Sequence, residues 1–161
     1  LDAASLMRQD DNIAFVLVGM GPDKSVLMER AQAEGLANVH FCDPVPKAQI
    51  PSLLDYFDIA FIGWHRQPLY RFGIAPNKLM DYMMAGRVVL HAVEAGNDSV
   101  GDAGCGLTVE PENPAAIADG LRRLSAMSPE ERKFLGLRGR DFVLKNHTYP
   151  VLADRFLAAC V

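Results

Sequence analysis

The sequence lacks three features that would point to common classes of protein. Its 161 residues contain no apolar run of the roughly 20 residues that a membrane-spanning helix requires. It has no excess of positive charge, because 16 Lys and Arg stand against 20 Asp and Glu, which gives a net charge of -4. That balance argues against a general nucleic-acid binder, although it leaves room for a local positive pocket.

Cysteine is also scarce, and its three copies, Cys42, Cys105 and Cys160, lie far apart in the chain. Such spacing provides neither a metal-ligand pair nor a disulfide framework, and the four histidines are equally scattered. We therefore expect no metal, no cofactor and a reducing, cytoplasmic setting.

Short apolar runs alternate with helical patterns along most of the chain. The run IAFVLVG, residues 13–19, is rich in β-branched residues and predicts a strand that is buried on both faces. Further strands are predicted at residues 38–43, 59–64, 87–93 and 106–110. This alternation predicts an α/β fold, a Rossmann-like parallel sheet flanked by helices, as a single domain over residues 1–161.

The segment YRFGIAPNKLMDYMMAG, residues 70–86, leads from a turn into a helix expected at residues 77–85. A helix N-terminus offers unpaired amides and about half a positive charge, and Lys78 adds a full charge there. Asp81 follows one turn later, and a carboxylate can accept hydrogen bonds from two sugar hydroxyls. Two interpretations stay open. One is a site for a ligand with phosphates and hydroxyls. The other is an ordinary helix in which Lys78 and Asp81 are solvated and four apolar residues lie in the core: Leu79, Met80, Met83 and Met84.

The polar loop before this turn carries two arginines, Arg66 and Arg71, that could reach a phosphate. His65 is a weaker candidate for a general base, because no residue close to it in sequence would orient it. The turn after the first strand has Gly19 and Gly21 but lacks the third glycine of a dinucleotide fingerprint. It indicates a tight turn or a close approach to a ligand and nothing more specific.

Taken together, two stretches resemble the C-terminal nucleotide-binding half of GT-B glycosyltransferases. They are FVLVGMGPDKSVLMERAQAEGLANVHFCDPVPKAQIPSLLDYFDIAFI and PNKLMDYMMAGRVVL. The similarity is to the glycosyl transferases group 1, or family 4, and to its bacterial polysaccharide branch. It implies a retaining enzyme that transfers a hexose from a nucleotide-diphosphate sugar to a glycan or lipid-linked acceptor. The acceptor would be held by an N-terminal domain preceding Leu1, so the chain would be a fragment of a longer two-domain protein and inactive alone.

The resemblance also implies roles for single residues. Lys78 would be catalytic by stabilising the leaving diphosphate, together with backbone amides between Gly73 and Lys78. Asp81 stands where the family has a glutamate that binds the ribose, and Val45 would lie beside the base. The implied donor-binding residues are Gly21, Val45, Arg71, Gly73, Ile74, Asn77, Lys78, Leu79 and Asp81, with no metal.

Three departures from the family pattern matter. Asp81 is one methylene shorter than the family's glutamate, which is expected to loosen or move the ribose contact. The loop has no glutamate near Gly73, where the family pattern places one, so the contact to the donor sugar is left open. The family's first strand of this half would precede Leu1. If that strand belongs at the middle of the sheet, we expect a gap with apolar strand edges, closed by altered pairing or filled by a neighbouring chain.

Competing interpretations remain from the sequence alone. One is a Rossmann dehydrogenase, which the broken glycine fingerprint disfavours. Another is a non-hydrolysing sugar-nucleotide epimerase, whose catalytic groups would lie in the missing half or the His65 loop. The third is a non-catalytic nucleotide-binding module, which solvent-facing Lys78 and Asp81 with no cleft toward Gly21 would favour. Dimerisation, and peripheral association of the full-length protein with the inner face of a membrane, are further expectations.

Overall fold

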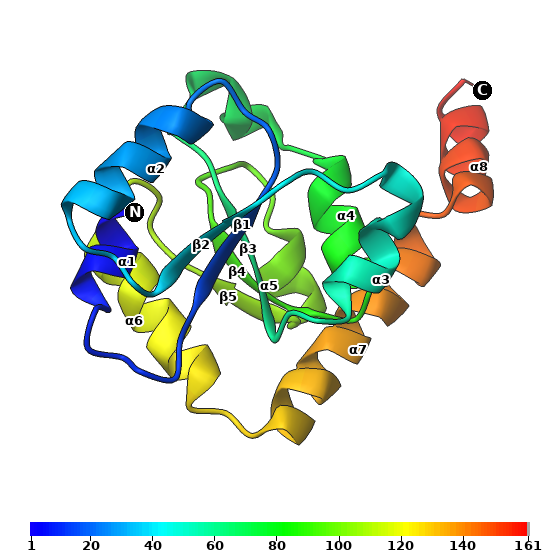
Figure 1. The fold of residues 1–161 in the computed structure, drawn as a ribbon. Helices are drawn as coiled ribbons and strands as arrows, with labels where there is room; N and C mark the ends of the chain where they lie inside the picture. The colour runs from blue at the N-terminus through cyan, green and yellow to red at the C-terminus, as the bar shows by residue number, and fades with distance from the viewer. Residues whose placement is uncertain (161) are drawn as a thin grey trace.

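Strands and helices alternate along the chain as predicted (Figure 1). The computed structural model describes residues 1–160. Every strand in this part lies inside its predicted range. The strands are β1 (Phe15–Val18), β2 (Val39–Cys42), β3 (Ile59–Gly63), β4 (Val88–Ala92) and β5 (Gly106–Thr108).

The helices connect and cover these strands. They are α1 (Asp2–Leu6), α2 (Lys24–Ala33), α3 (Ile50–Leu54), α4 (Asn77–Met84), α5 (Ser99–Ala103), α6 (Pro114–Ser125), α7 (Pro129–Asn146) and α8 (Tyr149–Ala159), with the short 3₁₀ turns η1 (Lys47–Gln49) and η2 (Pro68–Phe72). Among the described residues, none of them is both long and apolar enough to cross a membrane.

Local sequence signals explain where the longer helices begin. The Asn113 side chain accepts a hydrogen bond of 3.0 Å from the amide of Ala116 and so caps α6. Ser128 and Glu131 exchange hydrogen bonds at the start of α7, which is a capping box. Because such caps satisfy otherwise unpaired amides, the capping residues in the sequence indicate where these two helices begin.

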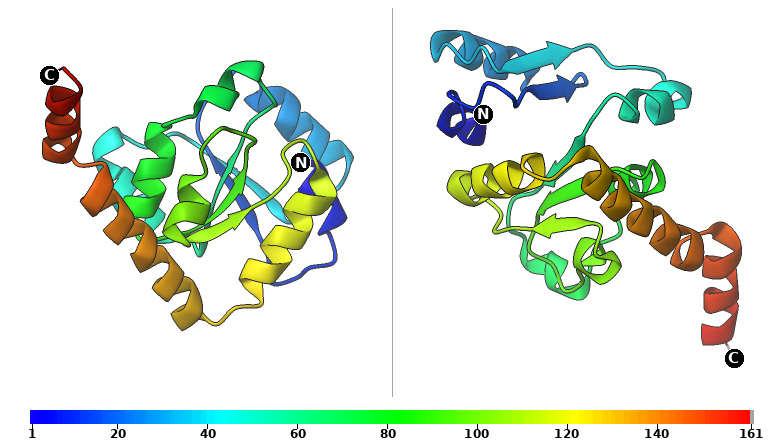
Figure 2. Two further views of the ribbon diagram at one scale, coloured as in Figure 1. Left: turned by 180° about the vertical axis from the view of Figure 1, so that it is seen from behind. Right: turned by 90° about the horizontal axis from the view of Figure 1, so that it is seen from below.

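The strands form two parallel sheets and not one. β1 pairs with β2, and β4 lies between β3 and β5. β1 and β3 are not paired with each other anywhere in residues 1–160. The right-hand view of Figure 2 shows the β1–β2 unit as a layer apart from the three-stranded sheet. The expected single sheet is therefore divided between β1 and β3, in agreement with the expected gap.

This division leaves apolar side chains exposed on the two strands that face it. Val16 and Leu17 on β1 are 41% and 37% exposed, and Phe61 on β3 is 44% exposed. The prediction that residues 13–19 form a strand buried on both faces is wrong for this reason. A strand with a neighbour on one side only lacks the cover that both faces receive inside a parallel sheet.

The N-terminal segment joins the two units through α6. The side chain of Met7 is fully buried among Val88, Leu90 and Leu124. Arg122 of α6 donates hydrogen bonds to the Asp10 carboxylate at 2.8 Å and to the Leu6 carbonyl at 3.0 Å. The apolar contact carries more of the stability, because the Arg122–Asp10 pair lies at the surface, where water screens the attraction.

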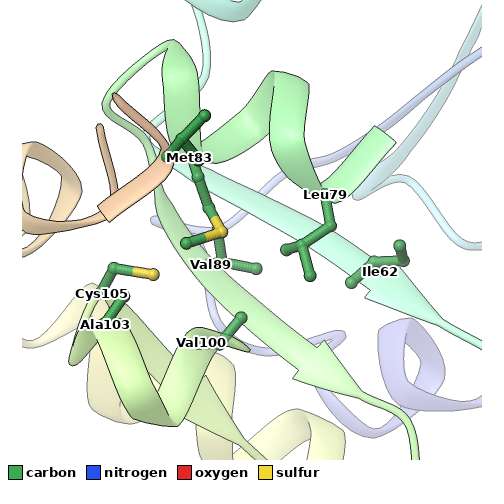
Figure 3. Packing of buried hydrophobic residues seen from close by; sticks show 8 residues of the cluster. Ile62, Leu79, Met83, Val89, Val100, Ala103 and Cys105 are labelled. Atoms are coloured by element: carbon green, nitrogen blue, oxygen red, sulfur yellow. The ribbon is translucent and has the colours of Figure 1, made fainter. Parts of the chain in front are cut away.

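Strand β4 is the centre of the core, since all five of its residues are buried. On one face, Leu79 and Met83 of α4 point toward Val89, as Figure 3 shows. On the other face, Val88 and Leu90 pack with α6. Burying one such side chain contributes about 2 kcal/mol, so these contacts determine where α4 lies. Met84 is 40% exposed, so the interpretation of an ordinary helix with all four apolar residues in the core is wrong for this residue.

We expect the open strand edges to drive self-association. Unpaired edges with exposed apolar residues recruit further strands, and a lysine on the edge opposes that pairing. Leu17→Lys and Phe61→Lys should therefore lower the average mass of the chain, measured by light scattering after gel filtration. Tyr56→Lys is the matched control, because Tyr56 is 84% exposed but lies outside the strands. A wild-type chain that stays monomeric at all concentrations would contradict this prediction.

The core also predicts which thiols react. Cys105 is fully buried beside Met83 and Val89, and burial raises its pKa to about 11. Cys42 and Cys160 are exposed. A thiolate reacts and a thiol does not, so the folded chain should titrate two thiols with an aromatic disulfide reagent, and the unfolded chain three. Cys105→Ser should leave the folded count at two; rapid reaction of all three thiols in the folded chain would argue against this packing.

Candidate functional site

The candidate site is the turn that leads from β3 into α4. Strands β3, β4 and β5 are parallel, so their carboxyl ends lie at one edge of the sheet, where α/β proteins bind ligands. Gly73 has φ +99°, a left-handed backbone that favours glycine, and it ends η2. Pro76 is the residue before α4 and has an extended conformation. The turn therefore places the N-terminus of α4 at this edge.

The backbone amides of the turn divide into paired and unpaired ones. The amide of Gly73 donates to the Tyr70 carbonyl at 2.9 Å, and the amide of Ile74 donates to a side chain described below. The Leu79 amide donates to the Pro76 carbonyl at 3.0 Å. Within residues 1–160 the amides of three residues have no acceptor: Ala75, Asn77 and Lys78. These three amides, and not the whole run from Gly73, are available to an anion.

Two charged side chains stand beside these amides. Lys78 and Asp81 are both exposed, and neither has an ion-pair partner in the described part of the chain. Leu79 lies between them in sequence, but its side chain is 1% exposed and belongs to the core. The arrangement offers a cation and free amides to an anion, and a carboxylate to hydroxyl groups, at one end of α4.

The structure separates the two arginines of the loop. Arg66 donates to Glu94 at 2.9 Å and to Glu110 at 2.8 Å, which raises its pKa and occupies its guanidinium. Arg71 has no ion pair within residues 1–160 and lies 4.6 Å from the centre of the Phe72 ring. Of the two, Arg71 is therefore the one whose charge is available to a ligand.

Glutamates from distant loops hold the segment that contains His65. Glu112 accepts from the Arg66 amide at 3.0 Å and lies 2.9 Å from Nδ1 of His65. These contacts, that of the Arg66 amide first, lower the pKa of Glu112. The pKa of Glu110 is also lowered, first by the Asn113 side chain and then by Arg66. His65 thus has an orienting carboxylate 47 residues away in sequence, which no local signal could reveal.

A hollow of about 600 Å³ lies beside this loop, at the carboxyl ends of β3 and β4. Its lining combines both arginines with the loop that follows β4, and consists of Arg66, Gln67, Pro68, Arg71, Glu94, Ala95 and Gly96. Lys78 and Asp81 are not among its lining residues. The hollow therefore offers Arg71 a place to meet a polar ligand, next to the turn and distinct from it.

A polar network that begins at a buried histidine supports the loop after β4. The side chain of His91 is 1% exposed, and its Nδ1 lies 3.3 Å from the Thr108 hydroxyl. That hydroxyl donates to Asp98 at 2.8 Å, and Asp98 caps α5. Burial lowers the pKa of His91, and the nearby Asp98 carboxylate opposes this only in part. The network connects β4, β5 and the start of α5.

Gly21 and Val45 lie on the other unit. Gly21 follows β1 and Val45 follows β2, whereas the other predicted residues follow β3. No hydrogen bond or ion pair described within residues 1–160 joins Gly21 or Val45 to residues 71–81. Seven of the nine predicted donor-binding residues thus lie within residues 71–81, after β3, and the other two follow β1 and β2. The described residues also contain no group of three or more His, Cys, Asp or Glu that could hold a metal ion.

Comparison with known proteins identifies the family of this chain. The model of the family described as "Glycosyl transferases group 1" matches residues 1–127. A putative colanic acid biosynthesis glycosyl transferase, WcaI from Escherichia coli (strain K12), is 29% identical over 127 residues, which are 76% of this chain and 30% of that protein. The chain thus spans about a third of the length of this curated relative.

Solved structures show the same fold. Sucrose-phosphate synthase from Thermosynechococcus elongatus superimposes with a TM-score of 0.75 and 19% identity, over 98% of this chain and 43% of that one. A mutant of TarM from S. aureus, in complex with fondaparinux, alpha-GlcNAc-glycerol and UDP, superimposes with a TM-score of 0.75 and 17% identity, over 98% and 31%. The parallel α/β architecture fits the C-terminal half of a GT-B glycosyltransferase. With its family model matched over residues 1–127, this chain belongs to the glycosyl transferases group 1.

Proposed function

We propose that this chain is the donor-binding domain of a glycosyltransferase and that the turn into α4 holds the diphosphate of a nucleotide-diphosphate sugar. One observation carries the proposal: in a chain of this family, three amides and a lysine without partners in residues 1–160 lie together at the start of α4. A diphosphate is the ligand chemistry that suits such a group, because it accepts several hydrogen bonds and carries the opposite charge.

The position of Asp81 indicates a second property of the ligand. A carboxylate one turn into the helix repels phosphate, so its partner is a neutral group with hydroxyls. The ribose of the nucleotide supplies two neighbouring hydroxyls next to the diphosphate. Asp81 is one methylene shorter than the family's glutamate, and its carboxylate is exposed and unpaired in the described part of the chain. We therefore assign the ribose to Asp81 and the diphosphate to Lys78.

The chemistry that these groups support is stabilisation of a leaving group. When the bond between the sugar and the diphosphate breaks, negative charge develops on the diphosphate oxygens. Lys78 and amides already aimed at these oxygens stabilise that charge with little rearrangement, which lowers the barrier. Arg71, with no ion pair inside residues 1–160, adds a further positive charge beside the turn. In this proposal the chain contributes electrostatics and positioning, and no metal.

The finer parts of the proposal concern the whole protein. We propose transfer of a hexose with retention of configuration, to a glycan or lipid-linked acceptor bound by a second domain. The relatives are two to three times longer than this chain, as the covered shares of 30%, 43% and 31% indicate, which leaves room for such a domain. The chain alone would bind the donor without turning it over.

The competing functions differ in what supports them. The family match favours glycosyl transfer over an epimerase or a dehydrogenase. The exposure of Lys78 and Asp81 also suits a non-catalytic binding module. That alternative and the glycosyltransferase both bind a nucleoside diphosphate, and they separate only when the full-length protein is given a donor and an acceptor.

The donor site can be tested by calorimetric titration of the chain with UDP, GDP, ADP and inorganic pyrophosphate. We expect one nucleoside diphosphate to bind best. Lys78→Ala should weaken both that nucleotide and pyrophosphate about tenfold, since a charge-assisted hydrogen bond contributes about 1.5–3 kcal/mol. Asp81→Ala should weaken the nucleotide alone, because pyrophosphate has no hydroxyls for the carboxylate.

Lys133→Ala is the matched control for charge. Lys133 is an exposed lysine on α7 without a described partner, and Figure 1 shows the start of α7 at the edge of the molecule opposite the turn. This variant should bind like the wild type. If the chain binds none of the four ligands, the same titration on the full-length protein shows whether the donor site exists. Failure there too, or equal binding by Lys78→Ala, would reject the proposal.

A further inference from the structure

A single side chain from the loop after β4 holds the turn at the residue before its free amides. The Ile74 amide donates to Oδ1 of Asn97 at 2.7 Å. The Nδ2 group of Asn97 donates to the Ile74 carbonyl at 3.0 Å. The carboxamide of Asn97 thus satisfies both backbone groups of one residue, as a neighbouring strand would do. Only an amide side chain offers a donor and an acceptor in this geometry.

The residue next to it makes a second attachment. The Gly96 amide donates to the Tyr70 carbonyl at 2.8 Å. A Cβ at position 96 would lie 2.1 Å from the Arg71 carbonyl oxygen, so only glycine allows the two backbones to approach this closely. Residues 70–74 are therefore held at two successive points by residues 96 and 97. Between these points lies Gly73, in its left-handed conformation.

The segment that follows has no such support. Ala75, Asn77 and Lys78 have amides without acceptors in the described part of the chain, and α4 has no side-chain cap. The direction of those amides depends on how the chain leaves Ile74. We infer that Asn97 is a positioning residue, which fixes Ile74 and thereby keeps the free amides of the turn directed at the diphosphate. This inference rests on the proposed donor site.

Stability and positioning make different demands on Asn97. Its side chain is exposed, so water can replace both hydrogen bonds when the residue is changed, and the cost to folding is small. Binding is more sensitive, because a turn that samples several conformations must be ordered when the ligand arrives. Loss of Asn97 should therefore weaken diphosphate binding far more than it lowers the melting temperature.

The test compares Asn97→Ala and Asn97→Leu with Asn146→Ala in titrations with pyrophosphate and with the preferred nucleoside diphosphate. Leucine has the shape of asparagine without its hydrogen bonds, so agreement between the two variants assigns the effect to those bonds. Asn146 is a matched control, because its side chain also makes two hydrogen bonds, to the Phe142 carbonyl and with Arg155, on the α7–α8 side of the molecule. We expect both Asn97 variants to bind about tenfold more weakly, with melting temperatures no lower than that of Asn146→Ala.

A second readout follows the turn itself. Hydrogen exchange of the amides at residues 73–78 should be faster in both Asn97 variants and unchanged in Asn146→Ala. Variants that bind as tightly as the wild type, or that lose binding only in proportion to a fall in melting temperature, would overturn the inference and leave the donor site standing. A full-length wild-type protein that binds neither ligand would remove the donor site, and this inference with it.

Discussion

The burial of β4 on both faces is the constraint on which the rest of the structure depends. Its residues meet α4 on one side and α6 on the other, and all five are buried. Because Leu79 and Met83 are anchored against Val89, the axis and the starting point of α4 are determined by apolar contacts well below the surface. The polar end of the helix is thereby presented at the carboxyl edge of the sheet, without any contribution from its own charges.

At the same edge of the sheet, charged residues from three loops pair with one another. The loops after β3, β4 and β5 meet where Arg66 contacts Glu94 and Glu110 and where Glu112 holds the backbone of Arg66. The arginine that these carboxylates neutralise is thus a structural tie. The charges left without described partners, on Arg71 and Lys78, are those nearest the turn. Since a carboxylate satisfies one cation and leaves another unpaired, the pairing decides which charge can meet a ligand.

The divided sheet shows how burial depends on neighbours. The apolar residues of segment 13–19 are typical of a strand that is covered on both faces, and β1 does form inside that range. Its residues are nevertheless exposed in part, because β1 and β3 each have a partner strand on one side only. Gly21 and Val45 follow the strands of the two-stranded sheet, whereas the other predicted residues follow β3. The pattern of apolar side chains indicates that a strand can be buried on both faces. Whether it is buried depends on the strands that pair with it.

The sequence by itself determined the positions along the chain of the strands described in residues 1–160, the capped starts of α6 and α7, and the turn into α4, with Lys78 in the first turn of the helix and Asp81 one turn later. These depend on neighbours within a few residues, through apolar periodicity, caps and glycine or proline geometry. Only the tertiary structure decided that Arg66 is engaged, that Glu112 orients His65, and that Asn97 holds Ile74. Those contacts join residues 23 to 47 positions apart, and their formation depends on which loops the packed sheet brings together.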